Sequence, residues 1–298
     1  MPDLTPKPLR SRGNAVINLM GTLGGIYSLI MIKTLVGSGA TPNYFPLFMS
    51  VAIFMIVCVI ILFLTIKEKK LRENMIYEDE TRKEEKESSN VKTKLPKDVQ
   101  RSLIFMLASI ALWFIGYNAV TTAFSRYATE VWGLQNGGYA DCLMVATVTA
   151  VIAYIPIAKV SAKIGRKKTI LIGITMLLIC YGSASFYSTY HVSRTFFFGL
   201  IGIGWASINV NSLPMVVEMC SSADVGKYTG YYYTFSMSAQ VITPILSRFL
   251  MENISYRVLF PYAVAFSALD FFTMTQVKHG DAKPAEKKSM LENFDIDD

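Results

Sequence analysis

The sequence has few charged residues for its length, and this scarcity bears first on the class of protein. Charged residues make up 17% of the 298 positions, against 52% hydrophobic residues. Most of the charges are gathered in a few short segments, whereas a soluble protein intersperses them along the chain. The distribution argues against a soluble domain. It also means that the net charge of +7 reflects loops on one side of a membrane and not a nucleic-acid-binding surface.

Residues that carry catalytic or metal chemistry are also scarce. The two histidines, His191 and His279, show no partner pattern, and the four cysteines stand at no paired or metal-ligand spacing. Buried free cysteines usually act as small apolar residues. No Ser/His/Asp order, metal-ligand cluster or phosphate-binding glycine loop occurs in the sequence. We therefore expect no enzyme activity, no cofactor and no metal site.

Long hydrophobic runs, in contrast, are abundant. Crossing the hydrocarbon core of a bilayer takes about 20 apolar residues in a helix. Eight stretches approach this length, and the one from Tyr44 to Ile66 contains no charge. The sequence therefore predicts an all-α integral membrane protein, a polytopic bundle of eight transmembrane helices. The predicted spans are 14–36, 44–66, 102–124, 137–158, 168–188, 195–217, 229–250 and 258–277.

The basic residues predict the orientation of these spans, because Lys and Arg are enriched in cytoplasmic loops. With a cytoplasmic N-terminus, 24 of the 29 Lys and Arg residues fall on the cytoplasmic side. No cleavable signal peptide is visible, since the first apolar run is long enough to span and lacks a small-residue cleavage site. We expect a multi-pass protein of the plasma or inner membrane with both termini in the cytoplasm. The five basic residues on the other side are Lys33, Arg126, Arg194, Arg248 and Arg257.

One long charged connection divides the spans into two and six. It holds eleven basic and nine acidic residues, which predicts a solvated, partly helical cytoplasmic loop. Pro46 and Pro261 open the second and eighth spans at an offset of 215 residues. Such an echo is typical of duplicated transporter halves, although apolar helices also resemble one another by chance. The expected organisation is 1–66, the last two helices of an incomplete N-terminal half; 67–101, the loop; 102–277, a complete six-helix half; and 278–298, a cytoplasmic tail.

The loop between the fourth and fifth spans contains Lys163-Ile164-Gly165-Arg166-Lys167. This stretch resembles part of a signature of the major facilitator superfamily, Gly-x-x-x-Asp-Arg-x-Gly-Arg-Lys. The loop departs from the signature at Ala158 and Ala162, where the superfamily has glycine and aspartate, which leaves the basic turn without the acid of the motif. The resemblance implies two six-helix halves around a central substrate path, joined by a long cytoplasmic loop. The matching residues are Lys163, Gly165, Arg166 and Lys167.

The sixth span extends the resemblance to one branch of the superfamily. Gly204-Trp205-Ala206-Ser207, followed by Leu213-Pro214-Met215, is similar to a stretch of sucrose-transporter-like proteins, which lie near the glycoside–pentoside–hexuronide:cation symporters. The resemblance implies helices five to twelve of a secondary active transporter for a sugar or glycoside, coupled to H⁺ or Na⁺. The chain would then be N-terminally truncated, with transport by eight spans alone in question and the missing N-terminal portion as an expected partner.

A sugar site needs amide and hydroxyl partners together with an aromatic surface for stacking. The third, sixth and seventh spans carry both kinds of residue at helical spacing. Polar groups in these stripes must face protein or water, because unpaired groups in hydrocarbon cost several kcal/mol. The alternative is that they only bond neighbouring helices, a contact worth about 0.6–2 kcal/mol. The candidate substrate-binding residues are Trp113, Tyr117, Asn118, Thr122, Trp205, Asn209, Asn211, Tyr233 and Gln240.

Charged residues within or beside the spans are few. Asp270 lies within the last span, where a carboxylate is a candidate proton or cation partner, with a structural pairing as the alternative. In the first span, Gly21 and Gly25 have the spacing that lets two membrane helices approach closely. The candidate coupling or gating residues are Asp270, Glu218, Arg126, Asp141, Gly165 and Arg166.

Two readings from different classes follow. The favoured one is a transporter that works by alternating access around a site near the middle of the membrane. The other is a non-transporting membrane scaffold or sensor derived from a transporter half, whose polar stripes would serve packing only. An integral membrane enzyme is the weakest reading, because no acid–base or metal constellation supports it.

Overall fold

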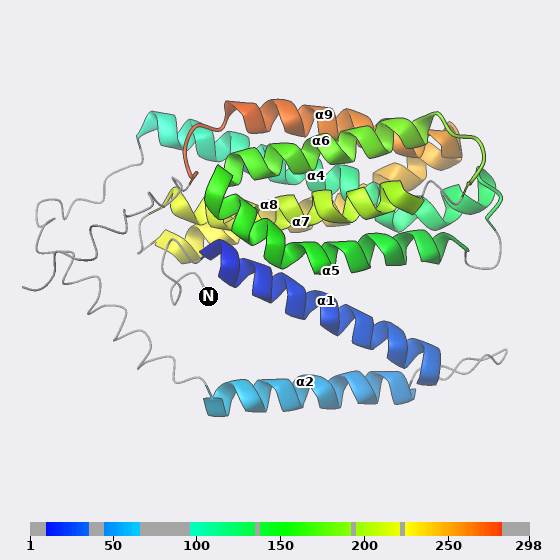
Figure 1. Ribbon diagram of the computed structural model, residues 1–298, viewed down its shortest axis with the longest axis horizontal. Helices are drawn as coiled ribbons and strands as arrows, with labels where there is room; N and C mark the ends of the chain where they lie inside the picture. Colours follow the sequence, from blue (N-terminus) through cyan, green and yellow to red (C-terminus); the bar gives the residue numbers. More distant parts are fainter. Residues whose placement is uncertain are drawn as a thin grey trace, which may run out of the picture. The chain divides into compact units, whose positions relative to one another are not determined.

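The eight predicted membrane segments are all helical. The computed structural model describes residues 10–35, 45–65, 96–134, 138–191, 195–220 and 224–281, and these residues contain no strand. Most of the charged connection at 67–101 and the tail beyond residue 281 lie outside the described residues. The helices are α1 (Arg10–Leu35), α2 (Phe45–Thr65), α4 (Lys97–Glu130), α5 (Gly138–Ile164), α6 (Arg166–Ser185), α7 (Thr195–Glu218), α8 (Val225–Asn253) and α9 (Leu259–Gln276), with a 3₁₀ turn, Tyr256–Val258, before α9 (Figure 1).

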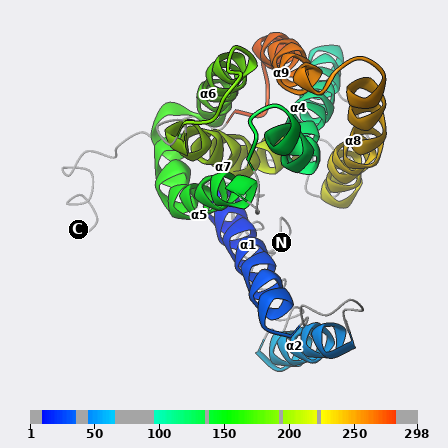
Figure 2. The same ribbon diagram turned by 90° about the vertical axis from the view of Figure 1, so that its right-hand side faces the viewer.

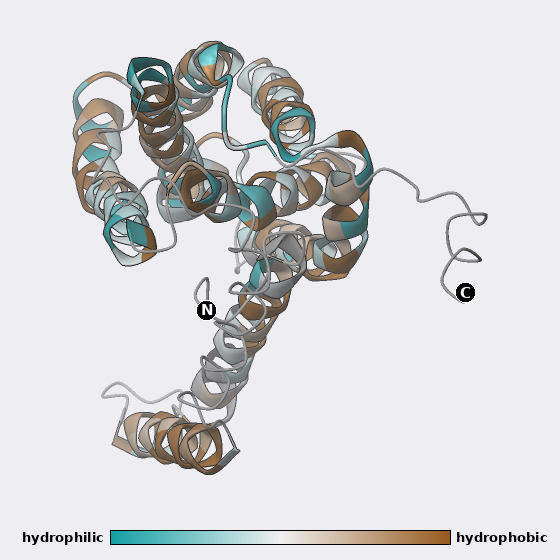
Figure 3. Ribbon diagram, turned by 90° about the vertical axis from the view of Figure 1, so that its left-hand side faces the viewer, coloured by the Kyte–Doolittle hydropathy of each residue, from teal (hydrophilic) through white to brown (hydrophobic). Residues whose placement is uncertain are grey.

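Six of these helices are long and apolar enough to cross a bilayer: α2, α4, α5, α6, α7 and the segment Tyr256–Gln276. The exceptions, α1 and α8, are long enough but carry more polar side chains. Helix α8, for example, contains Lys227, Arg248 and Glu252 besides several tyrosine, serine and threonine residues. Helix α2 is apolar over almost its whole circumference (Figure 3), and most of its side chains are exposed, as expected for a helix in contact with lipid. The chain is therefore an all-helical membrane bundle.

The chain divides into two compact units. The smaller one contains Ile17–Lys94, and the larger one contains Pro6–Val16 and Leu95–Asp298. Within the smaller unit, the Tyr27 ring stacks on Phe54 with ring centroids 4.5 Å apart. The Tyr27 hydroxyl also hydrogen-bonds the Ser50 hydroxyl at 2.8 Å. These contacts join α1 to α2.

The larger unit is built around α7 and α4. Helix α7 packs against α5 and α6, while α4 packs against α8 and α9, and α6 and α9 join the two groups (Figure 2). At one end of this unit α5, α7 and α9 end and α4, α6 and α8 begin (Figure 1); we call it the tail end. Because the buried side chains form one continuous cluster contributed by all six helices, a residue on α4 and a residue on α7 can meet in the core.

Glycines allow α6 and α7 to cross at very short range. A Cβ atom on Gly173 would lie 2.8 Å from the carbonyl oxygen of Gly204, and one on Gly204 would lie 3.0 Å from the carbonyl oxygen of Gly173. Real Cβ atoms do not approach other atoms under about 3 Å without a shift of the neighbour. Gly202 makes the equivalent approach to Ala146 and Thr149 of α5. The close packing of α7 against α5 and α6 therefore depends on Gly202 and Gly204, which have no side chain.

Candidate functional site

An aromatic cluster in the middle of the larger unit brings together three of the predicted substrate-binding residues. Tyr117 of α4 stacks on Trp205 of α7 with ring centroids 3.8 Å apart and planes at 24°. Trp113, one turn before Tyr117, meets the edge of the same indole at 4.8 Å. The indole nitrogen of Trp205 donates to the hydroxyl of Tyr154 on α5 at 3.3 Å. We call Trp113, Tyr117, Tyr154 and Trp205 the core aromatic cluster.

Two buried hydrogen-bond donors, one in this cluster and one on the residue after Tyr117, have no partner among the described residues. They are the indole nitrogen of Trp113 and the side-chain amide nitrogen of Asn118, and both atoms are buried. A buried donor without a partner costs about 1–3 kcal/mol, so such atoms are uncommon unless something else bonds them. The site therefore combines apolar ring surface with N–H groups suited to a ligand oxygen.

The two predicted asparagines of α7 lie next to this cluster in the chain but play different parts. Asn211 is fully buried: its amide oxygen accepts from Ser161 of α5, and its amide nitrogen donates to the Ser207 carbonyl at 2.8 Å. The carbonyl of Asn209 accepts from the side chain of Asn14 at 2.9 Å. Since both polar ends of the Asn211 side chain are already bonded, its geometry fits the packing alternative.

The predicted residues of α8 do not converge on the core aromatic cluster. Tyr233 is exposed, and Gln240 is only partly buried, with its amide 3.7 Å from the sulfur of Met237. The buried side of α8 carries Tyr232, whose hydroxyl meets that of Ser212 on α7 at 3.2 Å. The polar residues of α8 therefore fall into two groups. Tyr233 and Gln240 are exposed or partly exposed, whereas the hydroxyl residues Ser236, Thr243 and Ser247 are buried and donate to the backbone of their own helix.

Asp270 is buried at the contact between α9 and α4. Its side chain is 1% exposed, and one carboxyl oxygen accepts a hydrogen bond from the hydroxyl of Ser109. The other oxygen has no hydrogen-bond partner among the described residues. A buried carboxyl group held by one hydroxyl joins the two helices, and it is available for a second partner.

Three predicted gating residues meet at the tail end. Gly165 separates α5 from α6 and has φ of +95°, a conformation that residues with a side chain rarely adopt. The next residue, Arg166, is buried, and its guanidinium lies 3.3 Å from the carboxylate of Glu218 at the end of α7. The glycine turn therefore directs Arg166 inward, where it ties the start of α6 to the end of α7.

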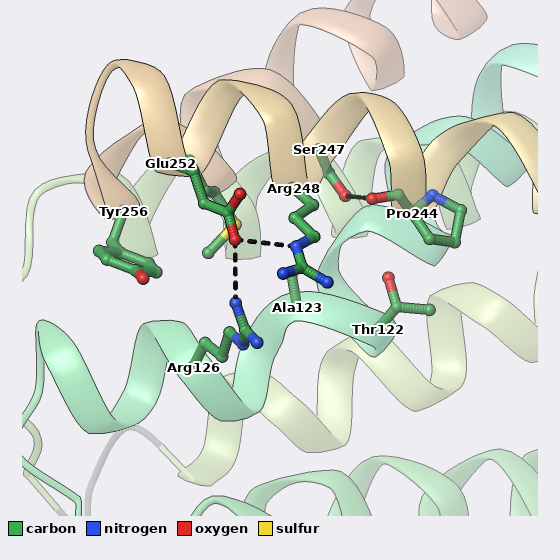
Figure 4. Close-up of a pocket in the computed structure, with 9 residues that line it drawn as sticks. Thr122, Ala123, Arg126, Pro244, Ser247, Arg248, Glu252 and Tyr256 are labelled. Atoms are coloured by element: carbon green, nitrogen blue, oxygen red, sulfur yellow. Dashed lines mark hydrogen bonds and ion pairs between the residues drawn. The ribbon is translucent and has the colours of Figure 1, made fainter.

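The other two predicted gating residues lie near the opposite end. Arg126 of α4 lines a small pocket between α4 and α8 together with Thr122, and it donates to Glu252 at 3.3 Å (Figure 4). Arg248 donates to the same carboxylate at 2.8 Å, and this hydrogen bond, with the charges of both arginines, lowers the pKa of Glu252. Asp141 is exposed in the first turn of α5. The Arg126–Glu252 pair links α4 to α8, whereas the Arg248–Glu252 pair lies within α8, and both pairs are open to water.

The comparison with protein families decides the identity of the fold. The sequence profile of the Major Facilitator Superfamily matches residues 106–292, more than half of the chain. The chain belongs to the major facilitator superfamily. Members of this superfamily are transporters rather than enzymes, so this chain is a membrane transporter that binds a small-molecule substrate within the bilayer. No curated protein matches the chain.

Within this superfamily member, sequence reasoning missed three residues of the site region. Tyr154 completes the core aromatic cluster, and Ser109 and Ser161 bond predicted residues from a neighbouring helix. A tyrosine inside an apolar span is a usable signal, because its hydroxyl needs a partner. The two serines gave no such signal, since a hydroxyl in a helix can bond its own backbone.

Proposed function

We propose that this superfamily member moves a sugar or glycoside across a membrane by alternating access. The observation that carries the proposal is the stack of Tyr117 on Trp205, with the N–H group of Trp113 in the same cluster and that of Asn118 on the same helix, both without a partner among the described residues. A sugar presents apolar ring faces and hydroxyl oxygens, and these match an aromatic surface and N–H donors. The partial similarity of residues 204–215 to sucrose-transporter-like proteins supports the same class.

In the proposed topology the protein lies in the plasma or inner membrane. Both termini and the tail end are on the cytoplasmic side. The distribution of Lys and Arg supports it. The proposed organisation has residues 102–277 as one six-helix half, and their packing into one compact unit supports it. Coupling to H⁺ or Na⁺ is part of the proposal, with Asp270 as the candidate carboxylate.

Uptake of labelled sugars and glycosides into vesicles that contain the protein tests this function. We expect uptake of at least one of them, and we expect Asn118→Ala and Trp205→Ala to abolish it at unchanged membrane abundance. An imposed pH or Na⁺ gradient should drive accumulation. If no sugar or glycoside is taken up, the proposed substrate class is wrong.

A matched pair of tryptophan variants separates the site from general packing. Trp205→Phe and Trp132→Phe each remove one indole N–H that donates to an oxygen, from Trp205 to Tyr154 and from Trp132 to the Tyr187 carbonyl at 3.2 Å. We expect Trp205→Phe to raise the substrate concentration needed for half-maximal uptake, and Trp132→Phe to leave it unchanged. Equal effects of the two variants would place the substrate site elsewhere.

A further inference from the structure

The five residues after α9 fold back onto the tail end of the larger unit; we call residues 277–281 the post-α9 segment. Val277 is fully buried, and the backbone amide of Lys278 donates to the Ser102 hydroxyl at 3.2 Å. The same hydroxyl meets the ring of His279 at 2.9 Å. Gly280 has φ of +86°, and a Cβ there would lie 2.6 Å from the Met215 carbonyl. The segment thus contacts both α4 and α7.

The segment ends at the start of α6, where it brings a carboxylate to the helix N-terminus. Asp281 accepts hydrogen bonds from the backbone amides of Arg166 at 2.6 Å and of Lys167 at 3.3 Å. The first amides of a helix have no partner within the helix, and a negative charge there is favourable. The side chain of Lys167 in turn donates to the carbonyls of Thr275 at 2.9 Å and Val277 at 2.5 Å.

This carboxylate reaches a turn that lacks an acid of its own. The loop resembles the superfamily signature, but Ala162 occupies the position where that signature has aspartate. The residue that Asp281 holds by its backbone, Arg166, is the one whose guanidinium pairs with Glu218. A shift of the α6 N-terminus would therefore move the Arg166–Glu218 pair as well.

We propose that Asp281 is a positioning residue of the gate: from the tail, it supplies the carboxylate that the loop lacks and holds Arg166 against Glu218. The proposal rests on the proposed function only because it treats the tail end as a transport gate. The contacts of Asp281 themselves do not depend on a solute. It predicts that the tail end opens more often when the carboxylate of Asp281 is lost.

Alkylation of Cys220 by a water-soluble maleimide measures this opening in the full chain. Cys220 lies two residues after Glu218, beside Met219, which contacts Gly280. The test chain keeps Cys220 and has serine at the other three cysteines. We expect Asp281→Ala to speed alkylation about tenfold, which corresponds to about 1.4 kcal/mol. Asp281→Asn keeps an acceptor oxygen and loses the charge, so it should speed alkylation of Cys220 about threefold.

Two controls separate a gate effect from general loosening. Asp98→Asn removes one exposed negative charge from the first turn of α4 and should leave the rate unchanged. Cys142, fully buried near the other end of α5, serves as the only cysteine in a second chain. Its rate should not respond to Asp281→Ala. An equal increase at Cys142 and Cys220 would show that Asp281 stabilises the fold without positioning the gate.

A relocated carboxylate gives the sharpest test. Ala162 is exposed at the end of α5, so Ala162→Asp fits there and restores the acid of the signature. Added to Asp281→Ala, it should return the Cys220 rate to within about threefold of the original. A rate that stays tenfold high would overturn the claim that Asp281 stands in for the loop acid. So would an unchanged rate in folded Asp281→Ala and Asp281→Asn chains.

The labelling needs no transported solute, so the outcomes remain distinct. A chain that labels as expected but takes up no sugar refutes the proposed substrate and supports the role of Asp281. A chain that takes up sugar with normal labelling in both Asp281 variants supports the proposed function and refutes this inference.

Discussion

The crossing of α6 and α7 at Gly173 makes a prediction that can be worked out from distances. A Cβ at this position would lie 2.8 Å from the Gly204 carbonyl oxygen and 2.9 Å from the Cβ of Ser207. Neither atom can rotate away, because one is backbone and the other is fixed to it. The two helices would have to separate by about 0.5 Å over the whole contact, with loss of the packing that it provides.

Overpacking of this kind costs about 1–3 kcal/mol, from which the better helix propensity of alanine recovers up to about 1 kcal/mol. We therefore expect Gly173→Ala to lower the free energy of unfolding by about 1–2 kcal/mol. In a unit of this size that shifts the thermal midpoint down by roughly 2–8 °C. The assay is thermal unfolding of the purified protein in detergent, followed by size-exclusion chromatography.

Gly182 provides a matched control in the same helix. No described atom lies within 4 Å of the position where its Cβ would stand. Gly182→Ala should therefore be neutral or stabilising by up to about 1 kcal/mol. The reasoning fails if Gly173→Ala is as stable as the original chain, or if Gly182→Ala destabilises it as much.

Three further outcomes follow from single contacts. Asn211→Ala should destabilise by about 1–3 kcal/mol, because the Ser161 hydroxyl loses its buried acceptor; its thermal midpoint checks this. Asp270→Asn should fold, since an amide oxygen still accepts from the neighbouring hydroxyl, whereas Asp270→Lys should abolish the folded peak in chromatography. Arg126→Ala should leave the thermal midpoint nearly unchanged, because its ion pair with Glu252 is exposed to water. The hydrogen bond from Arg248, with the charges of both arginines, lowers the pKa of Glu252; the stabilisation from these contacts is therefore present above the ordinary glutamate pKa and disappears as the pH falls through the lowered value, which a pH series of midpoints measures.

The positions of the helices could be predicted because long apolar runs bounded by charges are a strong signal. Every predicted span overlaps a helix with ends within a few residues, except that α4 extends from Lys97 to Glu130 against the predicted 102–124, and α5 continues to Ile164 against a predicted end at 158. Hydropathy reports only the part of a helix that suits lipid. A helix that continues into water keeps its backbone hydrogen bonds and leaves no apolar trace.

The sequence could not predict which neighbouring helix each face of a helix contacts. The spacing of Gly21 and Gly25 predicts close packing, and within the smaller unit no described atom lies within 4 Å of a Cβ on either of them, so their partner helix stays a prediction. Within the larger unit, a close crossing uses Gly173 and Gly204, which lie on different helices. Spacing within one helix describes only one of the two surfaces in a contact, and the other depends on tertiary packing.

The same limit applies to the candidate site. The aromatic residues on α4 and α7 were predictable as a group, since large rings inside membrane helices pack together. That Asn211 would bond Ser161, 50 residues earlier, was not. Neither was the return of Asp281 to Arg166 across 115 residues, because a single carboxylate in a charged tail carries no periodicity.

The composition of the core aromatic cluster gives the molecule an optical reporter of its own. The chain contains three tryptophans, and two of them, Trp113 and Trp205, meet at 4.8 Å in this cluster. The third, Trp132, stacks on Phe260 in a separate group of rings. In a Trp132→Phe chain all remaining indole emission comes from the cluster, so a solute that enters it would change the fluorescence of the unlabelled protein. Candidate solutes can therefore be screened by titration in detergent, before a transport assay exists.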